Sequence, residues 1–178
     1  MPTEQSIIQK AYALGAMRAA GVSPRDIATY PSLRELCEMN HCGCYGSNWG
    51  CPPGCGSVEA LTKRLRAYSH GVVYQYTGTL TDSFDFDGMM AANTFFNQIT
   101  YGLKAYLRGK AVPFLVLGAG KCSLCEACTY PDAPCRNPLF KNISVEACGI
   151  NVSELCTLAS LPYVAGKDTV TNTGLVLF

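Results

Sequence analysis

Three cysteines at regular spacing between residues 121 and 138 indicate a metal-binding segment. The segment reads KCSLCEACTYPDAPCRNP, and two residues separate Cys122 from Cys125 and Cys125 from Cys128. Thiolates are the ligands of zinc and of iron–sulfur clusters. Three closely spaced thiolates can reach three different irons of one cubane cluster, whereas a zinc ion more often takes its ligands from two separate turns. The spacing therefore predicts a [4Fe–4S] cluster on these three cysteines, with zinc as the alternative.

Cys135 is the candidate fourth ligand of this segment. In the bacterial ferredoxin run the fourth cysteine follows the third after three residues and precedes a proline. Here six residues separate Cys128 from Cys135, and Pro138 follows. Cys135 can close the same cluster or reach a second centre, as in two-cluster ferredoxins. We expect one of these fully ligated arrangements; the alternative is an open iron that binds a small substrate.

A second group of cysteines lies in a glycine-rich stretch of residues 37–56. Such a stretch has little preference for helix or strand, and a loop of this length needs an internal anchor. A metal centre would supply that anchor. Five thiols exceed the four that a cluster needs, so at least one is spare. The predicted metal ligands here are Cys37, Cys44, Cys51 and Cys55, while Cys42 is unassigned and His41 is read as a surface residue.

Glycines and cations flank the first group. The apolar run of residues 111–120 ends in Gly118 and Gly120, which would let backbone N–H groups approach a bulky anion. Lys121 and Arg136 lie beside the cysteines and would neutralise an anionic cluster or serve a substrate. We predict that these four residues contribute to cofactor binding. Glu146 is read either as a substrate-binding group or as a carboxylate favoured at a helix start.

Composition limits the class of protein. The chain has 178 residues, of which 48% are hydrophobic and 15% are charged, so we expect a single folded domain, residues 1–178. A net charge of +1 without a basic block gives no indication of nucleic acid, and no apolar run is long enough to span a membrane. Eleven cysteines without a secretion signal favour thiolate-bound metal over disulfides. The expected location is the cytoplasm.

The apolar pattern predicts an α/β or α+β fold: a small mixed sheet with flanking helices and two cysteine-rich cluster-binding loops. Residues 71–77, 88–108 and the run ending at residue 117 form a strand–helix–strand unit, which predicts a right-handed crossover. Ser57, Ser144 and Ser153 are read as helix N-caps. The remaining expected helices cover residues 4–20, 32–38, 57–68, 144–149 and 153–161, and a final strand covers residues 174–178.

Several short strings together resemble a known family. They are Cys44-Tyr45-Gly46, Trp49-x-Cys51-Pro52-Pro53, Gly118-Ala119-Gly120-Lys121-Cys122-x-x-Cys125-x-x-Cys128, Cys135-Arg136-x-Pro138 and Ser144-x-Glu146-Ala147-x-Gly149-Ile150. In this order the chain resembles the prokaryotic family of cysteine-rich domains of unknown function known as predicted metal-binding proteins. The resemblance implies metal binding through Cys37, Cys44, Cys51, Cys122, Cys125, Cys128 and Cys135. It does not assign Cys42, Cys55, Cys148 or Cys156, and it supplies no substrate.

Three functions follow as hypotheses. The first is an iron–sulfur protein with one or two [4Fe–4S] clusters that exchanges electrons with a redox partner protein. The second is an enzyme in which an open cluster iron binds a small substrate as a Lewis acid. The third is a structural zinc protein, in which the metal contributes folding energy alone.

Overall fold

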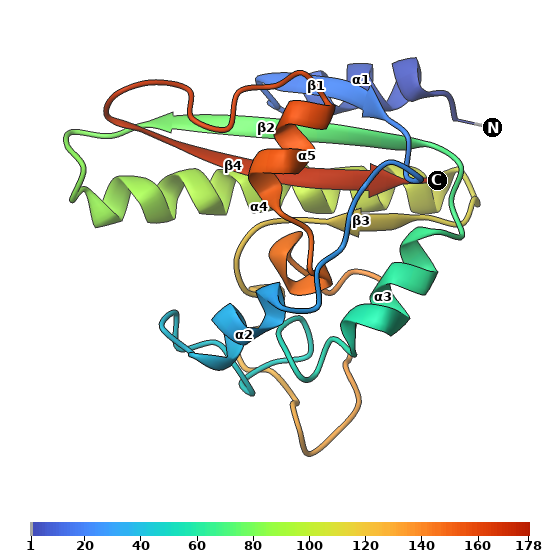
Figure 1. Ribbon diagram of the computed structural model, residues 1–178, viewed down its shortest axis with the longest axis vertical. Helices are drawn as coiled ribbons and strands as arrows, with labels where there is room; N and C mark the ends of the chain where they lie inside the picture. Colours follow the sequence, from blue (N-terminus) through green and yellow to red (C-terminus); the bar gives the residue numbers. More distant parts are fainter. Residues whose placement is uncertain (1) are drawn as a thin grey trace.

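A four-stranded sheet forms the centre of the computed structural model, which describes residues 2–178 (Figure 1). Its strands are β1 (Arg18–Val22), β2 (Gly71–Thr79), β3 (Leu115–Leu117) and β4 (Thr169–Leu177), in the spatial order β1-β2-β4-β3. Every neighbouring pair is antiparallel, so the sheet is antiparallel in its pairing instead of mixed. The α/β character and the small sheet are confirmed.

The predicted strand–helix–strand unit has an additional strand inside it. Since β2 and β3 both pair antiparallel with β4, they run parallel to each other, and α4 (Phe86–Gly109) connects them. β4 lies between them. It is nine residues long and pairs with β2 along its whole length, from Gly71 opposite Leu177 to Thr79 opposite Thr169. Only residues 174–178 were expected to form this strand. β3 is short and begins after Pro113.

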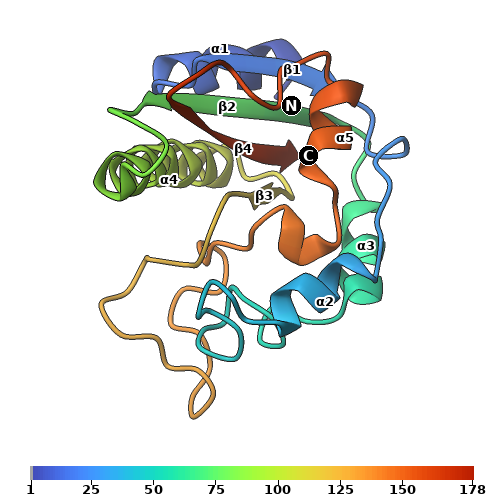
Figure 2. The same ribbon diagram turned by 60° about the vertical axis from the view of Figure 1, so that its left-hand side comes forward.

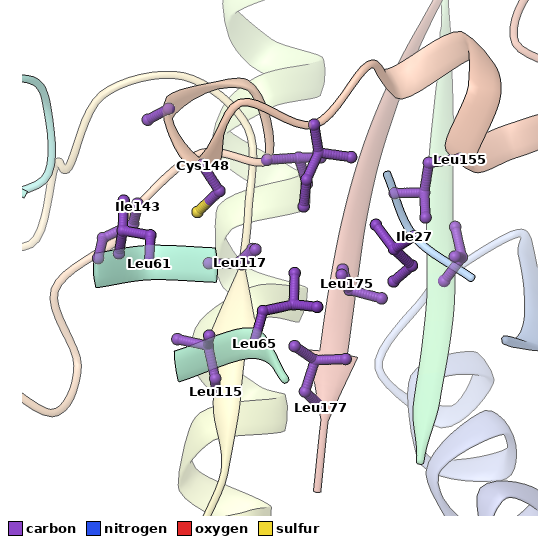
Figure 3. Packing of buried hydrophobic residues seen from close by; sticks show 14 of the residues in the cluster. Ile27, Leu61, Leu65, Leu115, Leu117, Ile143, Cys148, Leu155, Leu175 and Leu177 are labelled. Atoms are coloured by element: carbon purple, nitrogen blue, oxygen red, sulfur yellow. The ribbon is translucent and has the colours of Figure 1, made fainter. Parts of the chain in front are cut away.

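Both faces of the sheet are covered by apolar side chains. α1 (Glu4–Ala13) and α4 pack on one face, where Tyr74, Phe96 and Val176 are buried. α3 (Val58–Leu65), α5 (Val152–Leu158) and the 3₁₀ helix η1 (Glu146–Cys148) pack on the other face. Figure 3 shows this second cluster, with Cys148 pointing into it beside Leu61 and Leu117. The alternation of side chains along each strand sends neighbouring residues to opposite layers.

The expected helix over residues 4–20 is wrong in its second half. α1 ends at Ala13. Gly15 adopts a φ of 104°, which is incompatible with an α-helix, so the helix cannot continue through this residue. The Met17 N–H then donates to the Gln75 carbonyl oxygen at 2.8 Å, and β1 pairs with β2. The tertiary pairing with β2 overrides the helix preference of the alanines in this stretch.

The other helices match the expected positions within a few residues. Ser57 caps α3, Asp85 caps α4, and the Ser144 hydroxyl accepts from the Ala147 N–H before η1. The cap predicted at Ser153 is wrong, because the Asn151 side chain accepts from the first N–H groups of α5 instead. α2 (Leu33–Glu38) carries Cys37, as expected.

Both cysteine-rich stretches lie at the same end of the molecule, below the sheet in Figures 1 and 2. The loop after α2 and the loop after β3 run side by side in both views. Among the helices of residues 2–178, none combines the length and the apolar character that a membrane crossing requires. The sheet and α4 thus form a base from which two cysteine-rich loops project together.

Candidate metal centre

One small cavity gathers all four cysteines of residues 121–138. Cys122, Cys125, Cys128 and Cys135 line it together. Cys128 is exposed and the other three are half-buried, so the cavity lies near the surface. The remaining residues of the lining are Trp49, Leu124, Thr129, Arg136, Asn137 and Lys141. The structure therefore brings Cys135 to the same place as the three regularly spaced cysteines.

The excursion between Cys128 and Cys135 is folded back by its own hydrogen bonds. The Ala133 N–H donates to the Thr129 carbonyl oxygen at 2.9 Å. The Thr129 hydroxyl donates to the Pro134 carbonyl oxygen, also at 2.9 Å. These two bonds close the excursion into a compact turn, which returns Cys135 to the cavity.

Trp49 joins this turn to the other cysteine-rich loop. Its indole N–H donates to the Ala133 carbonyl oxygen at 3.0 Å, and its ring meets the Tyr130 ring edge to face at a centroid distance of 4.9 Å. A Cβ atom at Gly54 would lie 2.9 Å from the Tyr130 ring, so the two loops approach closely there. The wall of the cavity is thus built from both loops.

Three of the four sulfur atoms receive N–H groups. The Asn142 backbone N–H lies 3.3 Å from the Cys122 sulfur, and the Asn137 side-chain amide lies 3.5 Å from the Cys125 sulfur. Backbone N–H groups of Trp49, Tyr130 and Thr129 face Cys128. Such bonds stabilise a thiolate more than a neutral thiol.

The pKa of the Cys128 thiol reflects this arrangement. Partial burial is the largest influence and raises the pKa, but the three backbone N–H groups and the Arg136 guanidinium together hold it below its usual value. Hydrogen bonds and a positive charge both favour the thiolate, which is the form that binds metal.

The other cysteine-rich loop has a defined conformation of its own. The Gly46 N–H donates to the Pro52 carbonyl oxygen at 2.8 Å, and the Cys55 N–H donates to the Cys51 carbonyl oxygen at 3.0 Å. The buried Asn48 side chain accepts from the Gly50 N–H at 2.9 Å. Part of the internal anchor that this loop needs is therefore supplied by its own hydrogen bonds.

The thiols of this loop lie close enough to affect one another electrostatically. Burial raises the pKa of Cys51 to about 11, and the charges of Cys44, Cys55 and Cys42 act in the same direction, while a hydrogen bond from Asn48 opposes them. Burial also raises the pKa of Cys37, Cys44 and Cys55. Burial therefore favours the neutral thiol form of these cysteines.

The remaining predicted site residues occupy different positions. Arg136 lines the four-cysteine cavity, whereas Lys121 lies near Cys44, where its charge partly offsets the rise in pKa that burial causes. Gly118 and Gly120 lie against Asn142 and Asn93, outside the cavity lining. Gly118 is required there, because a Cβ atom would lie 2.4 Å from the Asn142 side-chain oxygen.

Two cysteines lie outside both loops in the sequence, and one of them, Cys148, shares its buried apolar cluster with Cys55. Cys148 is packed in the apolar cluster of Figure 3, and burial raises its pKa. Cys156 is completely buried, and its sulfur accepts from the Gln75 side-chain amide at 3.3 Å. Both behave as small core side chains.

Sequence reasoning missed Asn142, which contacts the Cys122 sulfur, and Lys104, which contacts the backbone of Lys141. Asn142 is completely buried, and Lys104 of α4 is 1% exposed. Asn142 has no sequence signal, since asparagine is common in loops. Lys104 does have one, because it interrupts the apolar face of a helix, where lysine is rarely fully buried.

The donor set of the cavity fits a thiolate-bound metal group. Four sulfur donors, N–H groups directed at three of them, and the cations Arg136 and Lys141 suit an anionic centre. Within residues 2–178, no three His, Cys, Asp or Glu side chains are grouped closely enough to hold one metal ion.

Comparison with known proteins gives one match. A family model described as "Predicted metal-binding protein (DUF2284)" matches residues 20–178. The match includes both cysteine-rich loops and the whole sheet except the first two residues of β1. No curated protein and no solved structure matches the chain significantly.

Proposed function

The chain belongs to the DUF2284 family of predicted metal-binding proteins, and we propose that it holds a [4Fe–4S] cluster and exchanges electrons with a cytoplasmic partner protein. Cys122, Cys125, Cys128 and Cys135 are the proposed ligands. The observation that carries the proposal is their meeting on one cavity whose sulfur atoms receive N–H groups. A bound cluster supplies reversible one-electron transfer at a potential set by its surroundings.

The choice of a cluster over zinc rests on how the thiols are arranged. A zinc ion draws four sulfur atoms to about 2.3 Å from one point. A cubane cluster is larger and takes each thiolate on a different iron. Three cysteines at two-residue spacing, which line one cavity together with Cys135, suit the larger group better.

Electron transfer, as opposed to substrate binding, follows from the position of Cys135. Four thiolates on four irons leave no iron open for a substrate. Cys135 lines the same cavity as the other three cysteines, so its role as the closing ligand is favoured over the crossed arrangement. The exposed Cys128 gives the centre an edge that a partner protein can approach.

A second centre on the neighbouring loop completes the proposal. Cys37, Cys44, Cys51 and Cys55 are its candidate ligands, and their mutual influence on pKa indicates that they lie near one another. The two loops meet at Trp49 and Gly50, which would place two centres side by side.

The test compares wild-type protein with Cys135→Ala after anaerobic purification. We expect the wild-type cluster to be reducible. Addition of a small thiol should leave its spectrum unchanged. The variant should lose cluster stability, change its reduction potential and respond to the added thiol at its open iron. Cys156→Ala, which removes a cysteine far from both loops, is the matched control.

Two results would contradict the proposal. A wild-type cluster that already responds to the added thiol has an open iron, which favours the enzyme function. A Cys135→Ala variant with unchanged iron content, potential and spectra shows that Cys135 is not a ligand.

A further inference from the structure

A polar stripe of α4 contacts residues 140–142, which follow the proposed cluster segment. Asn97 follows Asn93 by four residues and Lys104 follows Asn97 by seven, so the three share one side of the helix. Asn97 and Lys104 are buried, although burial of an amide or an ammonium group is unfavourable unless it is hydrogen-bonded. Each of these side chains has a partner, and the partners lead toward Cys122.

Asn142 is the point where this stripe meets both cysteine-rich loops. Its backbone N–H donates to the Cys122 sulfur at 3.3 Å. Its side-chain amide donates to the Ala119 carbonyl oxygen at 3.2 Å and to the Asn97 side-chain oxygen at 3.4 Å. From the other loop, a Cβ atom at Gly50 would lie 2.0 Å from the Asn142 carbonyl oxygen. Contacts with Ala119, Asn97 and Gly50 thus surround Asn142, whose backbone N–H donates to the Cys122 sulfur.

Asparagine side chains extend this contact back to the sheet. The Asn97 amide donates to the Asn93 side-chain oxygen at 3.0 Å, and the Asn93 amide donates to the Asn172 side-chain oxygen of β4 at 3.2 Å. The chain of amides therefore connects the proposed ligand Cys122 to a strand at the centre of the fold.

Lys104 fixes the peptide units immediately before Asn142. Its ammonium group donates to the Phe140 carbonyl oxygen at 3.1 Å and to the Lys141 carbonyl oxygen at 2.9 Å. Its ammonium also lies 5.6 Å from the centroid of the Tyr101 ring. These contacts restrain the backbone of residues 140 and 141. The next residue, Asn142, donates its N–H to the Cys122 sulfur.

Lys104 has no carboxylate partner in the part of the chain that the structure describes. The ion pairs found in residues 2–178 are His70 with Glu4 and Lys167 with Asp168. A buried cation without a counter-charge is costly, and a nearby anion offsets that cost. Burial is the largest influence on Lys104 and lowers its pKa to about 8; the nearby Cys122 opposes this shift, whereas Arg64 adds to it.

We propose that Lys104 and Asn142 are positioning residues of the metal centre: Lys104 holds the backbone of residues 140–142 so that the Asn142 N–H stays on the Cys122 sulfur, and together they raise the reduction potential. This inference rests on the proposed iron–sulfur function. Reduction adds negative charge to a cluster, and both an N–H group and a buried cation stabilise that charge. Neither residue touches the metal itself.

The experiment measures the reduction potential and metal content of wild-type, Lys104→Met and Lys63→Met proteins. Lys104→Met removes the charge and both hydrogen bonds while keeping much of the side-chain volume. Lys63 is exposed on α3 and serves as the control. We expect Lys104→Met to keep its iron and sulfide but to shift to a lower potential, with faster hydrogen exchange at the Asn142 N–H. Lys63→Met should match the wild type in both measurements.

A second variant keeps the test decisive if Lys104→Met does not fold. Lys104→Gln removes the charge but retains a hydrogen-bond donor, and it should also shift the potential downward. An iron-loaded, folded variant with unchanged potential and unchanged exchange would overturn the positioning role and leave the cluster assignment intact. Wild-type protein with zinc and no sulfide would instead overturn the cluster assignment, and the claim about potential with it.

Discussion

The two cysteine-rich loops differ in how ready their thiols are to bind metal. In residues 121–138, four cysteines line one cavity, N–H groups face three of the sulfur atoms, and the pKa of Cys128 is lowered. In residues 37–55, burial raises the pKa of several thiols, that of Cys51 to about 11. One loop favours the thiolate at Cys128, while burial in the other loop favours the neutral thiol form. We therefore expect metal to load first on the cavity of residues 121–138.

The largest expected effect comes from removing two ligands of that cavity. Cys122→Ala combined with Cys125→Ala should abolish its cluster, because two thiolates cannot hold a cubane that needs four. Anaerobic iron and sulfide analysis, with Cys156→Ala as the control, measures the loss. Full iron content in the double variant would mean that the metal is held elsewhere.

A smaller loss is expected from the matching change in the other loop. Cys44→Ala combined with Cys51→Ala should remove about half of the iron and spare the Cys122 centre, if each loop holds one cluster of the same type. Unchanged iron would show that these thiols are structural or spare. Loss of all the iron would point to one shared centre or to a collapsed fold, since metal binding and folding are coupled in such sites.

Gly50→Ala tests the contact between the loops without removing a ligand. The new methyl group would overlap the Asn142 carbonyl oxygen, which is 2.0 Å from that position. Overpacking at a buried position of this kind costs about 1–3 kcal/mol of unfolding free energy. Chemical denaturation measures it, and the cluster spectrum should change as well. Gly109→Ala is the control, because a Cβ atom there has no neighbour within 4 Å; equal behaviour of the two variants would refute the close contact.

The smallest effect is expected at Asp85, the N-cap residue of α4. Backbone N–H groups of Thr81 and Gly88 hold the pKa of this carboxyl below its usual range. A depressed native pKa gives a contribution to stability that is present above about pH 4, the ordinary pKa of aspartate, and lost as pH falls through the native value. Asp85→Asn should therefore be slightly less stable at pH 7 and show a weaker loss of stability in acid. Thermal unfolding at pH 7 and pH 3 checks this; an unchanged acid dependence would contradict it.

Local patterns in the sequence predicted much of the fold. The apolar face of α4, the cap at Ser57 and the turn at Gly149 are local signals, and each lies where it was expected. β1 was missed because its alanines favour a helix until β2 pairs with them. The position of β4 between β2 and β3 depends on contacts between distant segments, which periodicity does not record.

The site divides in a similar way. Cysteine spacing identified Cys122, Cys125 and Cys128, but it left two arrangements open for Cys135, whose return depends on hydrogen bonds made by Thr129. Asn142 was not foreseen, because its importance arises from contacts with Cys122, Asn97 and Gly50, which are remote from it in sequence.

The most direct test of the central claim is the metal and sulfide content of the wild-type protein purified without oxygen from iron-replete cells. We predict brown protein in which iron and acid-labile sulfide occur in roughly equal amounts, as in a [4Fe–4S] cluster. Colourless protein with stoichiometric zinc and no sulfide would contradict it.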